Sequence, residues 1–187
     1  LARALEERFA DRARVQRLDD LAHSLRALGQ DLEGVARRGR HDPEDRRDVA
    51  DRGVRLRVAD VGSGAGLPGL VLAMVRPDCD FVLIEPLERR TRWLRDQVLE
   101  LGLSNVEVFT GRAEEYGNTR TFDVVTARAV KALKGLIPWL EPLLVDGGRM
   151  LLLKGQRVDE EIDEAREWLP KAYWLECVSE YPTPAKH

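Results

Sequence analysis

A glycine-rich segment at the end of an apolar run constrains the fold of this chain more than any other feature. Residues 58–61 form the apolar run, which includes Asp60, and glycines follow at positions 62, 64 and 66. Glycines at alternate positions let the backbone turn sharply and let a ligand approach the main chain, where a Cβ atom would prevent contact. Pro68 then suits the first turn of a helix. The segment predicts a strand, a ligand-binding turn and a helix, in that order.

The composition is typical of one soluble α/β domain with an appendage. Of the 187 residues, 43% are hydrophobic and 34% are charged, and the net charge of −3 argues against bulk electrostatic attraction to nucleic acid. No uncharged apolar stretch of roughly 18 residues occurs, so we expect no membrane association. Cys79 and Cys177 are too few for a disulfide framework or a zinc site. Leu1 is not followed by a signal peptide, and we expect a cytoplasmic protein.

The chain divides near residue 53. Residues 1–53 lack β-branched runs, so we expect an N-terminal helical segment and a connection there, followed by the main domain over residues 54–187. Six apolar residues of the segment share one helical stripe: Leu18, Leu21, Leu25, Leu28, Leu32 and Val35. We expect this stripe to pack against the main domain of a monomer. A coiled-coil dimer is the alternative.

Strand and helix patterns alternate after residue 53. The predicted strands are Leu56–Val61, Phe81–Glu85, Val106–Phe109, Phe122–Ala127, Met150–Lys154 and Tyr173–Val178. The predicted helices are Leu67–Val75, Leu87–Leu101, Leu133–Leu140 and Asp159–Leu169. This alternation indicates an α/β fold with a mostly parallel sheet and helices on both faces. In such sheets a ligand binds beyond the carboxyl ends of the strands, where the strand order reverses.

The residues at two strand ends indicate an adenosyl cofactor. Glu85 ends the second predicted strand about twenty residues past the glycine turn, where a carboxylate can accept hydrogen bonds from ribose hydroxyls. The spacing Gly64-x-Gly66-x-x-Gly69 also satisfies the dinucleotide fingerprint. The register that starts at Asp60 is instead typical of class I methyltransferases. We expect Gly69 to allow close packing of the helix, and the alternative role for Asp60 is to order the turn.

Several motifs of the main domain, taken in order, resemble one bacterial family. The most specific is Asp60-Val61-Gly62-Ser63-Gly64-Ala65-Gly66-Leu67-Pro68-Gly69. The later ones are Glu85-Pro86-Leu87, Gly111-Arg112-Ala113-Glu114-Glu115, Thr126-Ala127-Arg128-Ala129-Val130 and Leu153-Lys154-Gly155-Gln156. Together they cover residues 58–157 and resemble the bacterial small-subunit (16S) ribosomal RNA guanine-N7 methyltransferase family, also called the glucose-inhibited division protein B family.

The resemblance implies a Rossmann-like, class I S-adenosylmethionine-dependent methyltransferase fold. It implies methyl transfer to N7 of a guanine in small-subunit ribosomal RNA or the ribosomal particle, with S-adenosylmethionine as cofactor and no metal. The cofactor-binding residues that it implies are Asp60, Gly62, Ser63, Gly64, Ala65, Gly66, Leu67, Glu85, Ala113, Glu114 and Arg128. It also implies a last strand beyond residue 186, which we expect to be missing because the sequence ends at residue 187.

Three basic residues beyond predicted strands are candidate RNA contacts. We predict Arg128 as the catalytic residue that contacts the guanine or its phosphate, because a guanidinium can pair with both. An ion pair with Asp123 or a neighbouring acid is the alternative. Arg112 is expected to position RNA or the cofactor carboxylate, with a surface salt bridge as the alternative. Lys154 is expected to contact a phosphate, unless it is a solvated lysine at a strand end.

Methylation at N7 also agrees with two motifs that are absent. Thr126-Ala127-Arg128-Ala129 stands where enzymes that methylate exocyclic amines commonly carry an Asn/Asp-Pro-Pro-aromatic element. Cys79 precedes the second predicted strand, at the wrong end of the sheet for a nucleophile that attacks a pyrimidine. Guanine N7 carries an in-plane lone pair and loses no proton, so an enzyme needs only to hold it in line with the methyl group.

Two further groups of residues have a structural and a functional interpretation. A solvated helix face is expected, over an RNA platform, for Arg89, Arg90, Arg92 and Arg95. Core or partly buried positions, rather than base-stacking positions, are expected for Trp93, Trp139, Trp168 and Trp174. The rival functions are a methyltransferase acting on a small molecule or protein, a catalytically impaired module that binds cofactor or RNA, and a nicotinamide dehydrogenase.

Overall fold

Strands and helices alternate along the main domain, as the sequence predicts. The computed structural model describes residues 25–26, 28–30, 32–34, 55–116, 122–128, 131–154 and 158–166. The strands are β1 (Leu56–Val61), β2 (Cys79–Glu85), β3 (Val106–Thr110), β4 (Phe122–Arg128) and β5 (Leu144–Leu153). The helices are α3 (Gly69–Val75), α4 (Glu88–Glu100), α5 (Leu133–Leu140) and α6 (Val158–Arg166), with the 3-10 helices η1 (Ala113–Glu115) and η2 (Glu141–Leu143). None of the described helices is both long and apolar enough to span a bilayer.

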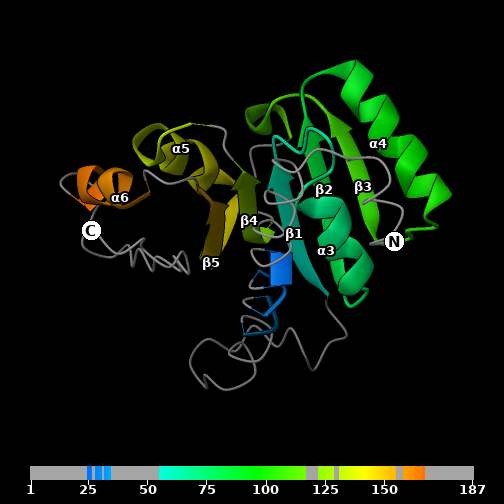
Figure 1. The fold of residues 1–187 in the computed structure, drawn as a ribbon, viewed down its shortest axis with the longest axis horizontal. Helices are drawn as coiled ribbons and strands as arrows, with labels where there is room; N and C mark the ends of the chain where they lie inside the picture. Colours follow the sequence, from blue (N-terminus) through cyan, green and yellow to red (C-terminus); the bar gives the residue numbers. More distant parts are fainter. Residues whose placement is uncertain are drawn as a thin grey trace, which may run out of the picture.

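The described strands form one parallel sheet in the order β3-β2-β1-β4-β5 (Figure 1). The chain moves outward from β1 to β3 and then returns to the other side of β1 with β4. The strand order therefore reverses between β1 and β4, and ligands of such sheets bind beyond the carboxyl ends of the strands at this point. Val61 pairs with Ala127, which places the turn after β1 next to Arg128 at the end of β4.

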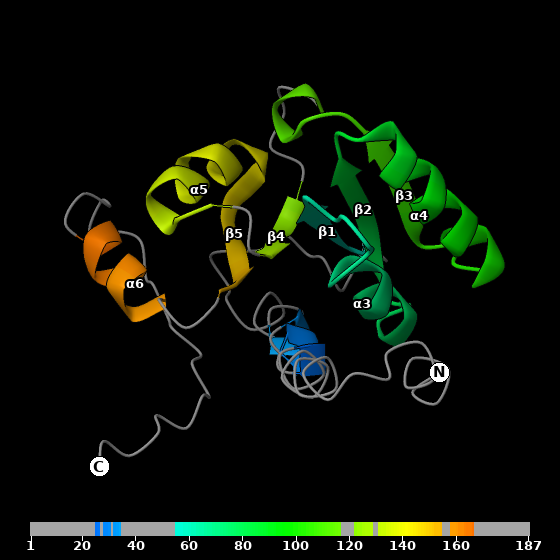
Figure 2. The same ribbon diagram turned by 45° about the horizontal axis from the view of Figure 1, so that its top comes forward.

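Alternating side chains of the strands build a core on each face of the sheet. Ala59 and Val61 of β1 pack on the side of α5 and η1. Val58 of β1 and Phe81 of β2 pack on the opposite side, against Leu72 of α3. Figure 2 shows α3 and α4 beside the half of the sheet formed by β1, β2 and β3, and α5 and α6 toward the β5 edge. The sheet is thus covered on both faces, as predicted.

The predicted strands and helices are confirmed wherever the structure describes them, although several begin or end at other residues than predicted. The largest difference is β5, which begins at Leu144 rather than at Met150. The pairing of β4 with β5 shifts register between Phe122 and Val124, whose partners are Leu144 and Arg149, so the strand contains a bulge before Met150. A Cβ on Gly148 would lie 2.9 Å from the carbonyl oxygen of Val145, which explains a glycine at the bulge. The predicted strand Tyr173–Val178 and the chain end lie outside the described residues.

The N-terminal stripe packs against the main domain at the positions that the structure describes. Leu28 and Leu32 are 5% and 1% exposed and join the core cluster on the α3 side of the sheet. The guanidinium of Arg76, which follows α3, donates to the carbonyl of Gly29 at 3.1 Å. Packing rather than coiled-coil exposure is therefore confirmed for Leu28 and Leu32. The domain boundary near residue 53 stays a prediction, because residues 35–54 lie outside the described ranges.

We expect Leu32→Ala to lower the free energy of unfolding by about 2–5 kcal/mol, because the substitution leaves a cavity in a closed core. Leu99→Ala is the matched control, because Leu99 is 79% exposed and its truncation should change stability by less than about 0.5 kcal/mol. Urea unfolding followed by circular dichroism measures both variants. Equal stabilities of the two variants would contradict the packing of Leu28 and Leu32 against the main domain.

Candidate active site

The turn between β1 and α3 holds three glycines in backbone conformations that other residues rarely adopt. The φ angles of Gly62, Gly64 and Gly66 are 76°, 56° and 84°. The Gly62 amide donates to the carbonyl of Ile84 at 2.8 Å, and the Gly66 amide donates to the carbonyl of Ser63 at 2.7 Å. These bonds fix the turn at the carboxyl end of β1, where the sequence predicts it.

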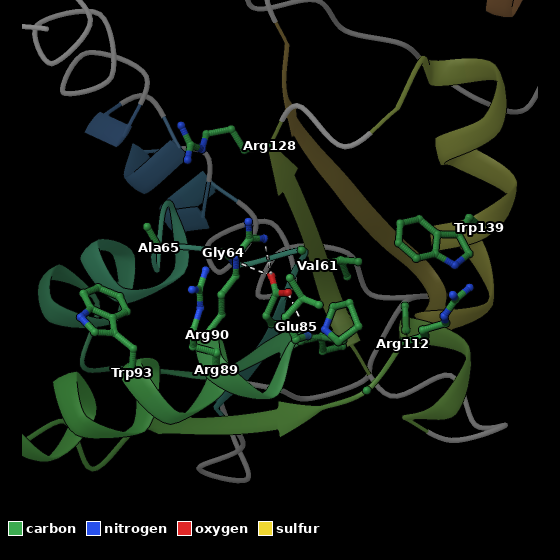
Figure 3. Close-up of a pocket in the computed structure, with 16 residues that line it drawn as sticks. Val61, Gly64, Ala65, Glu85, Arg89, Arg90, Trp93, Arg112, Arg128 and Trp139 are labelled. Atoms are coloured by element: carbon green, nitrogen blue, oxygen red, sulfur yellow. Dashed lines mark hydrogen bonds and ion pairs between the residues drawn. The ribbon is translucent and has the colours of Figure 1, made fainter.

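Glu85 connects this turn to the end of β2. Its side chain is 3% exposed. Oε2 accepts a hydrogen bond from the Gly64 amide at 3.0 Å, and Oε1 accepts one from the Leu87 amide at 3.1 Å. The Arg90 guanidinium lies 3.5 Å from Oε2 (Figure 3). Because each carboxylate oxygen carries two lone pairs, Glu85 keeps the capacity to accept further hydrogen bonds from a ligand.

Asp60 lies beneath the turn and does not line the cavity described below. Its Oδ2 accepts a hydrogen bond from the Gly69 amide at 3.0 Å, whereas Oδ1 has no hydrogen-bond partner among the described residues. A Cβ on Gly69 would lie 2.6 Å from Oδ2 and would overlap the side chain of Leu83. The predicted close packing at Gly69 is therefore confirmed. This geometry also matches the alternative role of Asp60, in which its carboxyl group orders the turn.

The surroundings of Asp60 favour its protonated form. Burial raises the pKa of the Asp60 carboxyl group from 3.8 to about 7, against the opposing effects of the Gly69 amide, Ser63 and the Arg128 charge. Thr126, which pairs with Asp60 in the sheet, is also buried, and its hydroxyl has no partner among the described residues. A wholly buried carboxylate loses its hydration, so the neutral acid is the less costly state.

We expect the contribution of Asp60 to the free energy of unfolding to fall as pH rises from about 4 to about 7, because the folded chain binds the Asp60 proton more tightly than the unfolded chain does. One pKa unit corresponds to about 1.4 kcal/mol, so the full effect is on the order of 4 kcal/mol. Asp60→Asn keeps an acceptor for the Gly69 amide and should remove this pH dependence. Urea unfolding across this pH range measures it, and equal slopes for Asp60→Asn and the unchanged chain would contradict the assignment.

A cavity of about 1050 Å³ opens beside the glycine turn, above the carboxyl ends of the strands. In Figure 3, Glu85 lies near the centre of the cavity. Trp93 of α4 lies on one side of it, and Arg112 lies on the other side together with Trp139, which belongs to α5. No group of three His, Cys, Asp or Glu residues that could hold a metal ion occurs in the described part of the chain. Because the cavity lies at the carboxyl ends of the strands and beside the turn after β1, it is where the reversal of strand order predicts a ligand site.

The structure brings together about half of the predicted site residues. Those that line the cavity are Gly62, Gly64, Ala65, Glu85, Arg112, Ala113 and Arg128. Those that do not line it are Asp60, Ser63, Gly66, Leu67, Glu114 and Lys154. Ser63 and Gly66 are buried within the turn, and a Cβ on Gly66 would overlap the side chain of Leu70. These two residues shape the turn from inside, and their contact with a cofactor stays a prediction.

The guanidinium groups of Arg128 and Arg112 both reach the cavity without an ion-pair partner among the described residues. The Arg128 side chain is exposed, and its Nε donates to the Leu67 carbonyl at 3.3 Å. Asp123, the alternative partner of Arg128, accepts a hydrogen bond from the Arg57 amide instead. Within the described ranges neither Arg128 nor Arg112 forms an ion pair. Both guanidinium groups are therefore available to an anionic ligand.

Lys154 takes part in packing at the β5 edge. Its ammonium lies 2.8 Å from Oε2 of Glu161 in α6 and donates to the Lys131 carbonyl at 2.6 Å. Its side chain is 8% exposed. Glu161 Oε2 also accepts a hydrogen bond from the Leu133 amide at the start of α5. Lys154 thus joins β5 to α5 and α6, and its predicted phosphate contact would require this ion pair to open.

Sequence reasoning missed five large side chains that line the cavity: Leu87, Arg89, Arg90, Trp93 and Trp139. Leu87 is 52% exposed and Trp93 is 41% exposed. Position along the chain is a usable signal for both, because they follow Glu85 at the ligand-binding edge of the sheet. Trp139 belongs to α5, which lies between β4 and β5 in the sequence. Only the packing of α5 against the sheet brings this side chain to the cavity.

Comparisons with known proteins agree with the motifs. Residues 48–177 match the family described as GidB, rRNA small subunit methyltransferase G. The ribosomal RNA small subunit methyltransferase G of Leifsonia xyli subsp. xyli is 55% identical over 114 residues, which cover 61% of this chain and 54% of that relative. That of Clavibacter michiganensis subsp. michiganensis is 53% identical over 121 residues, which cover 65% of this chain and 57% of that relative. The chain spans about half the length of the curated relatives it matches.

A solved structure, of a precorrin-6y C5,15-methyltransferase from Geobacter metallireducens GS-15, is similar with a TM-score of 0.49 and 16% identity, over 60% of this chain and 61% of that one. The sheet order and the helices on both faces confirm the predicted Rossmann-like, class I methyltransferase fold. The matched residues include the glycine turn, Glu85, Arg112 and Arg128. The chain belongs to the rRNA small subunit methyltransferase G family.

Proposed function

We propose that this chain performs S-adenosylmethionine-dependent methyl transfer to N7 of a guanine in small-subunit ribosomal RNA. Its family is named for methylation of this RNA. One observation carries the proposal: the glycine turn braced by Glu85 opens on a cavity that the described residues line with several arginines and with no carboxylate besides Glu85.

The part of the cavity around Glu85 fits an adenosine. Glu85 keeps lone pairs for the ribose hydroxyls, and Leu87 and Ala113 supply apolar surface for the adenine. Gly64 leaves room for close approach, since a Cβ there would contact only the Gly62 carbonyl, at 3.7 Å. These residues would hold S-adenosylmethionine, which when bound supplies a methyl group activated by a sulfonium.

The lining of the cavity favours an acceptor atom that needs no deprotonation. The described residues that line it include no His, Cys, Lys or Tyr, and Glu85 is their only carboxylate. Both oxygens of Glu85 already accept backbone hydrogen bonds. Methylation of an exocyclic amine would require a group to take its proton, whereas guanine N7 offers a lone pair directly. Alignment of N7 with the methyl group is then the main task of the site.

Arg128 is the residue that we expect to orient the guanine. It ends β4 beside the glycine turn, and its guanidinium can donate to O6 of guanine or to a phosphate oxygen. Both atoms differ from N7, so the reacting lone pair stays free. Arg112 lies on a different side of Glu85 in Figure 3 and would contact the backbone of the same RNA.

Transfer of tritiated methyl groups from S-adenosylmethionine to unmodified small ribosomal subunits tests the proposal. We expect label in the ribosomal RNA at a site that borohydride and aniline cleave, as is diagnostic of N7-methylguanine, and no label on free guanine nucleotides. Arg128→Ala should lower kcat/KM by about 100-fold, because a hydrogen bond to a charged group is lost at the reacting base.

Arg92→Ala is the control for that substitution, because Arg92 pairs with Glu88 on the exposed surface of α4 and does not line the cavity. Methylation of a protein or small molecule that is unaffected by Arg128→Ala would instead support the rival methyltransferase function. Binding of S-adenosylhomocysteine without turnover on authentic subunits would support a module that binds without catalysis.

A further inference from the structure

The cavity has an excess of positive charge that Glu85 does not balance. Four arginines line it, namely Arg89, Arg90, Arg112 and Arg128, against the single buried carboxylate of Glu85. Only Arg90 pairs with that carboxylate; within the described part of the chain the other three form no ion pair. The whole chain has a net charge of −3, so the positive charge is a local property of this site.

The cofactor accounts for at most one of these arginines, through its single carboxylate. At neutral pH S-adenosylmethionine carries a sulfonium, an ammonium and one carboxylate, so its own net charge is positive. Guanidinium groups without acidic partners around a cationic cofactor create a positive potential that attracts a second, anionic ligand to the cavity. A phosphodiester backbone supplies several such charges, and guanidinium groups bind it well.

Arg89 and Trp93 also line the cavity, and the contacts proposed above for the guanine and the cofactor do not involve them. They stand four residues apart on α4, so they lie on the same face of the helix, one turn from each other. The Trp93 side chain is 41% exposed although it borders the cavity. In Figure 3 it lies on the side of Glu85 opposite Arg112 and Trp139. An exposed aromatic ring next to an unpaired arginine is suited to single-stranded nucleic acid, whose bases stack on such rings.

We propose that Arg89 and Trp93 are a platform for a nucleotide that flanks the target guanine, with the base stacked on Trp93 and its phosphate bound by Arg89. The inference rests on the proposed function and deepens it, since it assigns the direction in which the RNA leaves the site, along the start of α4. It requires a single-stranded segment at the target, because a base inside a duplex has no free face for the indole.

Affinity of the full chain for unmodified small-subunit ribosomal RNA, measured at several salt concentrations, tests this platform. Trp93→Ala should weaken RNA binding about tenfold, and Trp93→Phe should restore most of it, because stacking needs an aromatic ring. Arg89→Gln should lower the slope of log affinity against log salt by about 0.7, as expected for one lost contact to a single strand. Arg92→Gln, which removes the same charge from a neighbouring position outside the cavity, should leave the RNA affinity within about twofold.

Calorimetry with S-adenosylhomocysteine and thermal melts of the same variants separate the possible outcomes. Unchanged cofactor affinity together with the RNA effects would support the platform. A loss of cofactor affinity in Trp93→Ala would overturn it, because Trp93 would then contact the adenosine. RNA affinities of Trp93→Ala and Arg89→Gln equal to that of Arg92→Gln would also overturn it, while methyl transfer by the unchanged chain would leave the proposed function intact.

Discussion

Replacing Glu85 with glutamine is expected to weaken binding of S-adenosylhomocysteine by about 100-fold. An amide NH₂ group takes the place of one acceptor oxygen, so either the Gly64 or the Leu87 amide loses its partner. The ribose hydroxyls lose a charged acceptor at the same time, and a hydrogen bond to a charged group contributes about 1.5–3 kcal/mol. Titration calorimetry at neutral pH measures the dissociation constant directly.

Glu88→Gln is the matched control for this substitution. Glu88 begins α4 three residues later, its side chain is 77% exposed, and it does not line the cavity. Its replacement should leave the dissociation constant within about twofold, because an exposed ion pair contributes little. If Glu85→Gln binds S-adenosylhomocysteine as tightly as Glu88→Gln does, the adenosine does not occupy the part of the cavity next to β2.

Gly64→Asp is expected to abolish measurable binding of S-adenosylhomocysteine, with a loss of more than about 100-fold, while the chain stays folded. The Cβ of the new residue has room, since its nearest contact is the Gly62 carbonyl at 3.7 Å, and aspartate is among the residues that tolerate a φ of 56°. The carboxylate would fill the cavity beside the negatively charged Glu85, which accepts the hydrogen bond of the Gly64 amide. Calorimetry and a thermal melt together separate loss of binding from loss of fold.

Gly102→Asp provides a control with nearly the same backbone conformation. Gly102 follows α4 and has a φ of 63°, and among the described residues no atom lies within 4 Å of a Cβ added to it. The Gly102→Asp variant should have the same thermal stability as Gly64→Asp. It should bind the cofactor as tightly as the unchanged chain does. Gly64→Asn separates bulk from charge, because it has the same size without the negative charge. Tight binding by Gly64→Asp would show that the ligand does not approach this turn.

Most of the fold was predictable because its signals are local. The apolar runs that became β1 and β2, the glycines at alternate positions and the proline before α3 each depend on the preferences of a few neighbouring residues. Glu85 was predictable for a related reason, since one strand and one helix separate it from the turn and chain topology leaves little choice of position. The start of β5 was not, because the bulge that includes Gly148 depends on pairing with β4.

The residues of the site fall into the same two groups, those that local sequence signals predict and those that depend on contacts between distant segments. The sequence determined which residues stand at the carboxyl ends of the strands, and so it identified Gly64, Glu85, Arg112 and Arg128 at the cavity. Only the tertiary structure decided that Asp60 points beneath the turn to Gly69, that Lys154 is held by Glu161, and that Trp93 and Trp139 reach the cavity from helices on opposite faces of the sheet. The physical reason is that strand ends follow from short-range order along the chain, whereas the direction and partners of a side chain depend on packing between segments far apart in sequence.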